Sequence, residues 1–149
     1  MFLSVLLYIS ITFLCPFYTQ AFLNIFNIVI KKAIERVGIY FYVLPTYAQA
    51  KKAIWDCIDS SGMKMLEHIP KEIIFKLNET EMQIELVNGS LVQIVGADNV
   101  DRLVGTNPVG IVFSEYSLMK EEVWELMRPI LAENGGWAIF NFTPKSGAS

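Results

Sequence analysis

The sequence predicts an α/β fold built on a mainly parallel sheet. Two short apolar runs, Val109 to Phe113 and Trp137 to Phe142, have the length and composition of strands buried on both faces. Between them, Lys120 to Leu131 places its apolar residues at helical spacing. A third apolar run, Ile39 to Leu44, also precedes a helical pattern. Strands that alternate with helices are typical of parallel sheets, because parallel neighbours need a crossover connection.

Two helices flank the third of these strands. Upstream, apolar residues recur at helical spacing from Ile25 to Val37, and Gly38 follows as a C-cap. Downstream, Thr46 and Gln49 have the spacing of a capping box, in which Thr46 accepts from the helix backbone and Gln49 reaches back. We expect that second helix to run from about Tyr47 to Ile58.

One β-hairpin is predicted between Glu81 and Val95, where the period of the apolar residues changes to two. Asn88-Gly89 lies between the alternating stretches MQIELV and SLVQIV, and this dipeptide tolerates the positive φ of tight hairpin turns. The sheet should therefore carry an antiparallel pair beside its parallel strands.

The first thirty residues differ from the rest of the chain. The stretch from Met1 to Ile30 contains no charged side chain and is long enough to span a hydrocarbon core of about 30 Å. Basic residues follow it at once. Pro16 and several polar residues interrupt the apolar character, so a membrane helix and a displaced start in front of the domain both stay open. We expect one domain over residues 31–145 and a short tail over residues 146–149, since 149 residues hold one ordinary core.

Composition excludes several kinds of site. A net charge of −3 provides no basic face for nucleic acid, so we do not expect the chain to bind DNA by itself. Cys15 and Cys57 form neither a close pair nor a metal-type spacing, and the single histidine, His68, offers them no obvious partner.

Polar residues follow two neighbouring predicted strands at the point where each ends. Ser114 and Glu115 come directly after the first apolar run as an exposed pair, and Thr143 follows the second. Open α/β sheets bind ligands at the carboxyl ends of their strands. An ATP-hydrolysing sheet of the P-loop class needs a carboxylate there to orient the attacking water and a polar sensor on the neighbouring strand. Glu115 and Thr143 fit these two roles.

Four blocks of sequence lie in order between Lys31 and Lys145. They read YFYVLPTYAQAKKAIW, VGADNVDRLVGTNPVG, GIVFSEYSLM and RPILAENGGWAIF, the last followed by TP. This series resembles the ATPase domain of the large terminase subunit, the motor that packages DNA in tailed phages. The resemblance implies a partial fold of the P-loop NTPase type (the ASCE class), with flanking helices around the sheet, and it implies ATP and Mg²⁺ as cofactors.

The resemblance also implies roles for the strand-end residues. Glu115 matches the catalytic carboxylate that polarises the water attacking the γ-phosphate; the alternative is a solvated loop carboxylate. Ser114 stands where many relatives carry Asp, so it is a candidate for nucleotide binding and, through a water, for weak contact with magnesium. Thr143 matches the coupling position that senses the γ-phosphate; the alternative is an ordinary threonine at a strand end.

The phosphate-binding loop of this class is missing from the sequence. Such a loop surrounds the phosphates with the backbone amides of a glycine-rich turn and adds a lysine. No glycine precedes Gly38 and no lysine precedes Lys31. We therefore expect a fragment of the packaging motor, inactive alone, without the phosphate cradle or the nuclease domain. The family implies double-stranded DNA, a small terminase subunit and the portal or procapsid as partners, and the host cytoplasm as location.

Two alternatives stay open. The chain could be a non-enzymatic protein that keeps an inherited α/β scaffold and is held at the inner membrane by residues 1–30. It could also keep catalysis by borrowing the missing loop from another chain, as the product of a split gene would.

Overall fold

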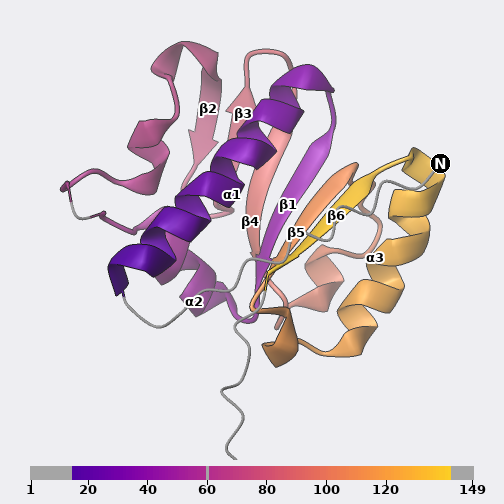
Figure 1. Ribbon diagram of the computed structural model, residues 1–149. Helices are drawn as coiled ribbons and strands as arrows, with labels where there is room; N and C mark the ends of the chain where they lie inside the picture. Colours follow the sequence, from indigo (N-terminus) through magenta and orange to yellow (C-terminus); the bar gives the residue numbers. More distant parts are fainter. Residues whose placement is uncertain (1–14, 60, 142–149) are drawn as a thin grey trace, which may run out of the picture.

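The fold is a six-stranded, mainly parallel sheet with helices on both faces (Figure 1). A computed structural model describes residues 15–59 and 61–141. The strands are β1 (Ile39–Leu44), β2 (Ile74–Asn78), β3 (Gln83–Leu86), β4 (Leu91–Gly96), β5 (Gly110–Ser114) and β6 (Trp137–Asn141). Their order in the sheet is β2-β3-β4-β1-β5-β6. Neighbouring strands from β4 to β6 in this order pair in parallel, whereas β3 pairs antiparallel with both β2 and β4. The predicted fold class is confirmed.

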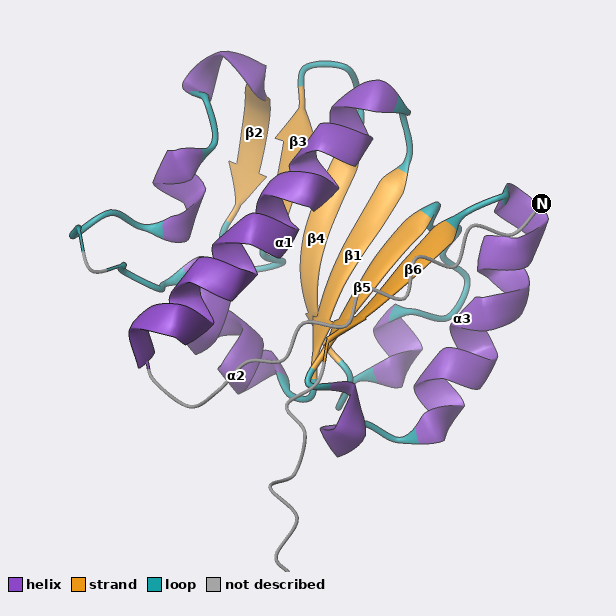
Figure 2. Cartoon of the chain, viewed as in Figure 1, coloured by secondary structure: helices purple, strands orange, loops and turns teal. Residues whose placement is uncertain are grey.

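Helices cover the two faces of the sheet and form two separate apolar cores (Figure 2). On one face, α1 (Cys15–Glu35) packs against alternate residues of β1, including Tyr42. On the other face, α3 (Glu121–Asn134) packs against the residues between them, including Val43. Because both faces are covered, strands β1 and β5 are buried at almost every position, which explains their continuous apolar sequence.

Helix α1 differs from the prediction at both ends. It begins ten residues before the expected Ile25 and ends at Glu35, before Val37. Gly38 does not act as a C-cap, since its φ is not positive. The last carbonyls of α1 are instead bonded by side chains of the sheet: the Tyr40 hydroxyl lies 2.6 Å from the Arg36 oxygen and the Ser90 hydroxyl 2.7 Å from the Ala33 oxygen.

The second helix is shorter than predicted. Helix α2 covers Tyr47–Ala50 and continues as a π-helical turn over Lys51–Trp55, so the expectation of a helix to Ile58 is wrong for its end. The Thr46 cap is confirmed, because the Gln49 backbone N–H donates to Thr46 Oγ1 at 3.1 Å. The predicted return contact from the Gln49 side chain is wrong, since that side chain bonds elsewhere.

The hairpin at Asn88-Gly89 is confirmed, with Gly89 at φ +94° between β3 and β4. Strand β2 was not predicted from the sequence. It pairs with β3 at the edge of the sheet and is largely exposed, with Phe75 at 70%. An edge strand without a covered face lacks the apolar periodicity by which strands are recognised.

Helix α3 is longer than predicted. Pro129 is exposed and does not shorten the helix, which continues to Asn134. Gly135, at φ +62°, ends it, and the Arg36 guanidinium donates to the carbonyl oxygens of Asn134 at 2.7 Å and Gly135 at 3.2 Å. These bonds satisfy two carbonyls at the helix end and connect the end of α1 to the end of α3.

The second half of the uncharged N-terminal segment is part of the core. Phe22, Ile25, Phe26 and Val29 are at most 1% exposed and pack on the sheet. Across residues 15–59 and 61–141, no helix combines the length and the apolar character needed to cross a membrane. Residues 1–14 of the predicted segment over residues 1–30 lie outside the described residues, as does the tail at residues 146–149.

Candidate functional site

The connections after β1 and β5 lead to opposite faces of the sheet. After β1 the chain enters α2, which contributes to the core on the face of α1. After β5 it enters α3 on the other face. The carboxyl ends of β1 and β5 are therefore a topological switch point, where open α/β sheets bind their ligands. Any site of this fold should be sought between these two strand ends.

Glu115 occupies this position in a strained backbone conformation. It follows β5 directly, and its φ of 58° and ψ of 43° are in the left-handed region. For a residue other than glycine, that conformation costs roughly 1 kcal/mol or more. Strain of this kind is concentrated at functional sites, where the surrounding structure holds it. Burial raises the pKa of the Glu115 carboxyl above its usual range.

Gln49 reaches Glu115 from the other side of the switch point. Its side-chain amide Nε2 donates a hydrogen bond to Glu115 Oε2, although the two residues are 66 positions apart in the sequence. The spacing of Thr46 and Gln49 predicts a capping box, and this spacing alone gives no indication that Gln49 contacts another strand end. The sequence feature that indicates this contact is the position of Gln49 in the first helical turn after a parallel strand.

Three buried polar side chains lie on β1, β5 and β6 near these strand ends. Tyr42 is opposite Val112 in the sheet, and Ser114 is opposite Asn141. Because Ser114 is two residues beyond Val112, all three polar side chains lie on the face that α1 covers. Their exposure is 0% for Tyr42 and Ser114 and 4% for Asn141.

The Tyr42 and Ser114 hydroxyls and the Asn141 Oδ1 atom have no hydrogen-bond partner within the described ranges. Burial raises the pKa of the Tyr42 hydroxyl, and the nearby Ser114 hydroxyl opposes this in part, but no bond of good geometry joins the two. Buried polar groups are nearly always paired, so these three atoms on adjacent strands are exceptions within the described ranges.

The structure changes part of the predicted site. Ser114 is not exposed as expected but fully buried, because β5 extends one residue beyond the apolar run. Glu115 is partly buried at the predicted strand end. Thr143 lies outside the described residues, while Asn141, two positions earlier, pairs with Ser114. Tyr42 and Asn141 were missed because an isolated polar residue in an apolar run gives no signal without the register of the sheet.

The described side chains do not make up a magnesium site. No group of three or more His, Cys, Asp or Glu in residues 15–59 and 61–141 could hold a metal ion. Ser114 is neutral and buried, so it supplies no charge to a cation. The sequence also contains no glycine-rich phosphate loop. The described residues therefore do not fit the metal-binding or phosphate-binding parts of a nucleotide site.

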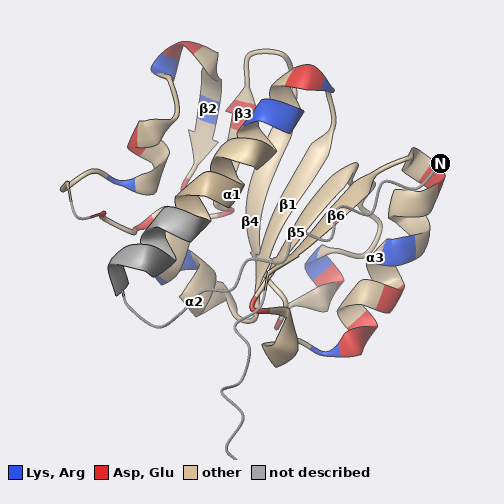
Figure 3. Cartoon of the chain, in the orientation of Figure 1, with Lys and Arg blue, Asp and Glu red and all other residues tan. Residues whose placement is uncertain are grey.

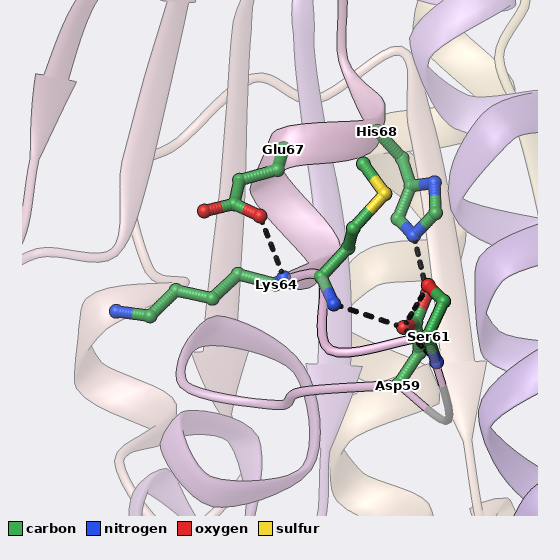
Figure 4. A network of polar contacts seen from close by, with 6 residues as sticks. Asp59, Ser61, Lys64, Glu67 and His68 are labelled. Carbon is green, nitrogen blue, oxygen red and sulfur yellow. Dashed lines mark hydrogen bonds and ion pairs between the residues drawn. The ribbon is translucent and has the colours of Figure 1, made fainter.

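A second polar cluster surrounds Asp59 in the loop after the π-helical turn (Figure 4). Its carboxylate accepts from the Ser61 hydroxyl at 2.5 Å, the Met63 backbone N–H at 3.0 Å and His68 Nε2 at 2.7 Å. These bonds, that of Ser61 first, hold the pKa of Asp59 well below its usual range. The Ser61 hydroxyl donates to Asp59, which also bonds His68, so this is not the arrangement in which a serine donates to a histidine base. The hydrogen bond between Asp59 and His68 connects the two ends of the loop that lies between them.

No family model matches the chain, and no curated protein is significantly similar to it in sequence. Among solved structures, the large terminase ATPase domain of Thermus phage P74-26 aligns with a TM-score of 0.63 at 20% identity, over 88% of this chain and 57% of that domain. The fold of this chain is therefore similar to that of a large-terminase ATPase domain.

Two further solved structures of large terminases also align with this chain. A mutant of the same phage domain aligns with the same values, and the large terminase of a second, thermophilic bacteriophage aligns with a TM-score of 0.56 at 17% identity, over 77% of this chain and 29% of that one. The predicted resemblance to terminase ATPase domains is thereby confirmed for the fold. The chain spans 57% of the length of the P74-26 domain.

Proposed function

We propose that this chain is part of the ATP-hydrolysing motor that packages DNA in a tailed phage or prophage, and that it supplies the acidic strand-end half of the nucleotide site. The observation that carries the proposal is Glu115, a strained, partly buried carboxylate at the switch point of a terminase-type ATPase fold. The structures that share the fold are large terminase ATPase domains.

Glu115 is the residue that polarises the attacking water in this proposal. A carboxylate fixed at the end of a strand can orient water without moving, and burial raises its pKa, which makes the ionised carboxylate a stronger base. Ser114 and Thr143 belong to the nucleotide side of the site, with Thr143 as the coupling residue. The buried Asn141 is opposite Ser114 and extends this polar side.

The phosphate cradle has to come from outside the 149 residues, because the sequence contains no P-loop. We therefore expect the isolated chain to bind Mg·ATP weakly or not at all. Calorimetric titration tests this directly, and micromolar affinity would contradict it. A neighbouring reading frame that encodes a Gly-Lys loop upstream would support a split or broken motor.

Double-stranded DNA, a small terminase subunit and the portal or procapsid are the proposed partners of the assembled motor, in the host cytoplasm. Basic and acidic residues are interspersed along the described part of the chain (Figure 3). We expect the chain alone to retain no DNA in a filter-binding assay at physiological salt, since stable binding needs clustered cations. Salt-sensitive retention would contradict this.

The alternative is a membrane-anchored, non-enzymatic protein, and the observation that favours it is the absence of charge from Met1 to Ile30. The packing of Phe22 and Phe26 inside the domain favours the motor fragment instead. Carbonate extraction separates the two: recovery of the protein in the membrane pellet supports the anchor.

A further inference from the structure

Gln49 connects the two strand ends of the switch point. Its amide Nε2 is the donor to Glu115 Oε2, and it belongs to the first helical turn after β1. A hydrogen bond to an ionised carboxylate is stronger than one between neutral groups and favours the charged form. Since Glu115 has a strained backbone, an interaction with its carboxylate helps to keep the residue in that conformation.

The turn that carries Gln49 is fixed at its start. The Gln49 backbone N–H bonds Thr46 Oγ1 at 3.1 Å, and the Tyr47 backbone N–H bonds Asp98 Oδ1 at 3.0 Å. Gly96 at the end of β4 approaches so closely that a Cβ there would lie 2.1 Å from the Tyr47 nitrogen. The end of β4 therefore supports the helix start directly.

The same helix is also anchored to the turn between β2 and β3. The Tyr47 hydroxyl donates to the Thr80 carbonyl oxygen at 3.2 Å, and Trp55 Nε1 donates to the Glu79 carboxylate. Trp55, at 1% exposure, ends the π-helical turn that follows α2. Gln49 thus extends from a short helix that is held at both ends.

We propose that Gln49 is a positioning residue for Glu115, whose carboxylate it holds in one orientation at the switch point. The inference rests on the function proposed above, because that function requires a carboxylate of fixed orientation. Gln49 does not act on a substrate; it acts through Glu115. A merely structural Gln49 would fill space and leave the titration and the rotamer of Glu115 unchanged.

The test uses NMR on the whole chain with Gln49→Met, which keeps the length of the side chain and removes the donor. The matched control is Gln93→Met, since Gln93 Nε2 donates to the Glu81 carbonyl oxygen and not to Glu115. We expect Gln49→Met to raise the pKa of Glu115, read from its carboxyl carbon, and to average its Hα–Hβ couplings. Gln93→Met should change neither.

A reciprocal measurement covers the case in which Gln49→Met does not fold. In the unmodified chain, the side-chain NH₂ signals of Gln49 should follow the titration of Glu115, and in Glu115→Gln this pH dependence should be lost. NH₂ signals that ignore the titration, or a Glu115 that titrates and rotates identically in both Met variants, would overturn the proposal. No nucleotide is present, so failure of the proposed ATPase function is a separate result.

Discussion

Replacing Tyr42 by Phe should stabilise the protein, whereas the same change at Tyr40 should destabilise it. The two tyrosines are two residues apart on β1 and face the same core. The Tyr42 hydroxyl is buried without a partner in the part of the chain that the structure describes. The Tyr40 hydroxyl instead bonds the Arg36 carbonyl oxygen at 2.6 Å, at the end of α1. The hydroxyls therefore contribute with opposite signs.

The magnitudes follow from these contacts. Leaving a buried polar group unpaired costs about 1–3 kcal/mol, so removing the Tyr42 hydroxyl should raise the free energy of unfolding by about 1 kcal/mol. Phe keeps the ring and its packing against Phe22 and Phe26, whose centroids are 6.1 and 6.4 Å away, so no cavity opens. Removing the Tyr40 hydroxyl deletes a hydrogen bond and should lower the free energy of unfolding by about 1 kcal/mol.

Urea unfolding followed by tryptophan fluorescence measures both changes. The midpoint should rise for Tyr42→Phe and fall for Tyr40→Phe, with the same m-value in each because the surface exposed on unfolding is unchanged. A Tyr42→Phe protein destabilised as much as Tyr40→Phe would refute the reasoning. It would mean that the Tyr42 hydroxyl is hydrogen-bonded in the folded protein.

Four further tests probe other parts of the molecule. Glu115→Gly should be more stable than Glu115→Ala by about 1 kcal/mol in thermal unfolding, because the left-handed φ favours glycine; the opposite order would contradict that conformation. Since burial raises the pKa of Glu115, stability should fall as pH rises from its unfolded pKa to its folded pKa, and Glu115→Gln should remove that slope. Asp59 has a lowered pKa, so its contribution is present above the unfolded pKa and is lost as pH falls through the folded one; Asp59→Asn should weaken the acid dependence of unfolding, and an unchanged profile would count against it. Gly110→Ala would place a Cβ 2.5 Å from the Trp137 ring and should cost about 1–3 kcal/mol, read from the denaturant midpoint; a neutral result would show that the ring can move.

The sequence predicts the buried strands well and the contacts between distant elements poorly. The bounds of β1 are those predicted, because an apolar run covered on both faces ends sharply at Pro45. The end of β5 was predicted one residue too early, at Phe113, because Ser114 is polar, although it is buried in the strand. Strand β2 was missed because it is exposed and carries no regular pattern.

The other differences depend on tertiary contacts. The end of α1 is bonded by Tyr40 and Ser90, and Ser90 is 57 residues away from the carbonyl that it bonds. Likewise, the burial of Ser114 depends on the register of β5 with β6, and the partner of Gln49 depends on how α2 approaches β5. Spacing in one sequence contains no information about such register.

ATP hydrolysis in the reassembled site tests the central claim most directly. The chain would be co-expressed with the polypeptide that supplies the Gly-Lys loop, and Glu115→Gln would be compared with Glu121→Gln, a matched change on the exposed side of α3. We predict hydrolysis by the unmodified pair and by Glu121→Gln, and its loss in Glu115→Gln. Equal hydrolysis with and without the Glu115 carboxylate would contradict the account.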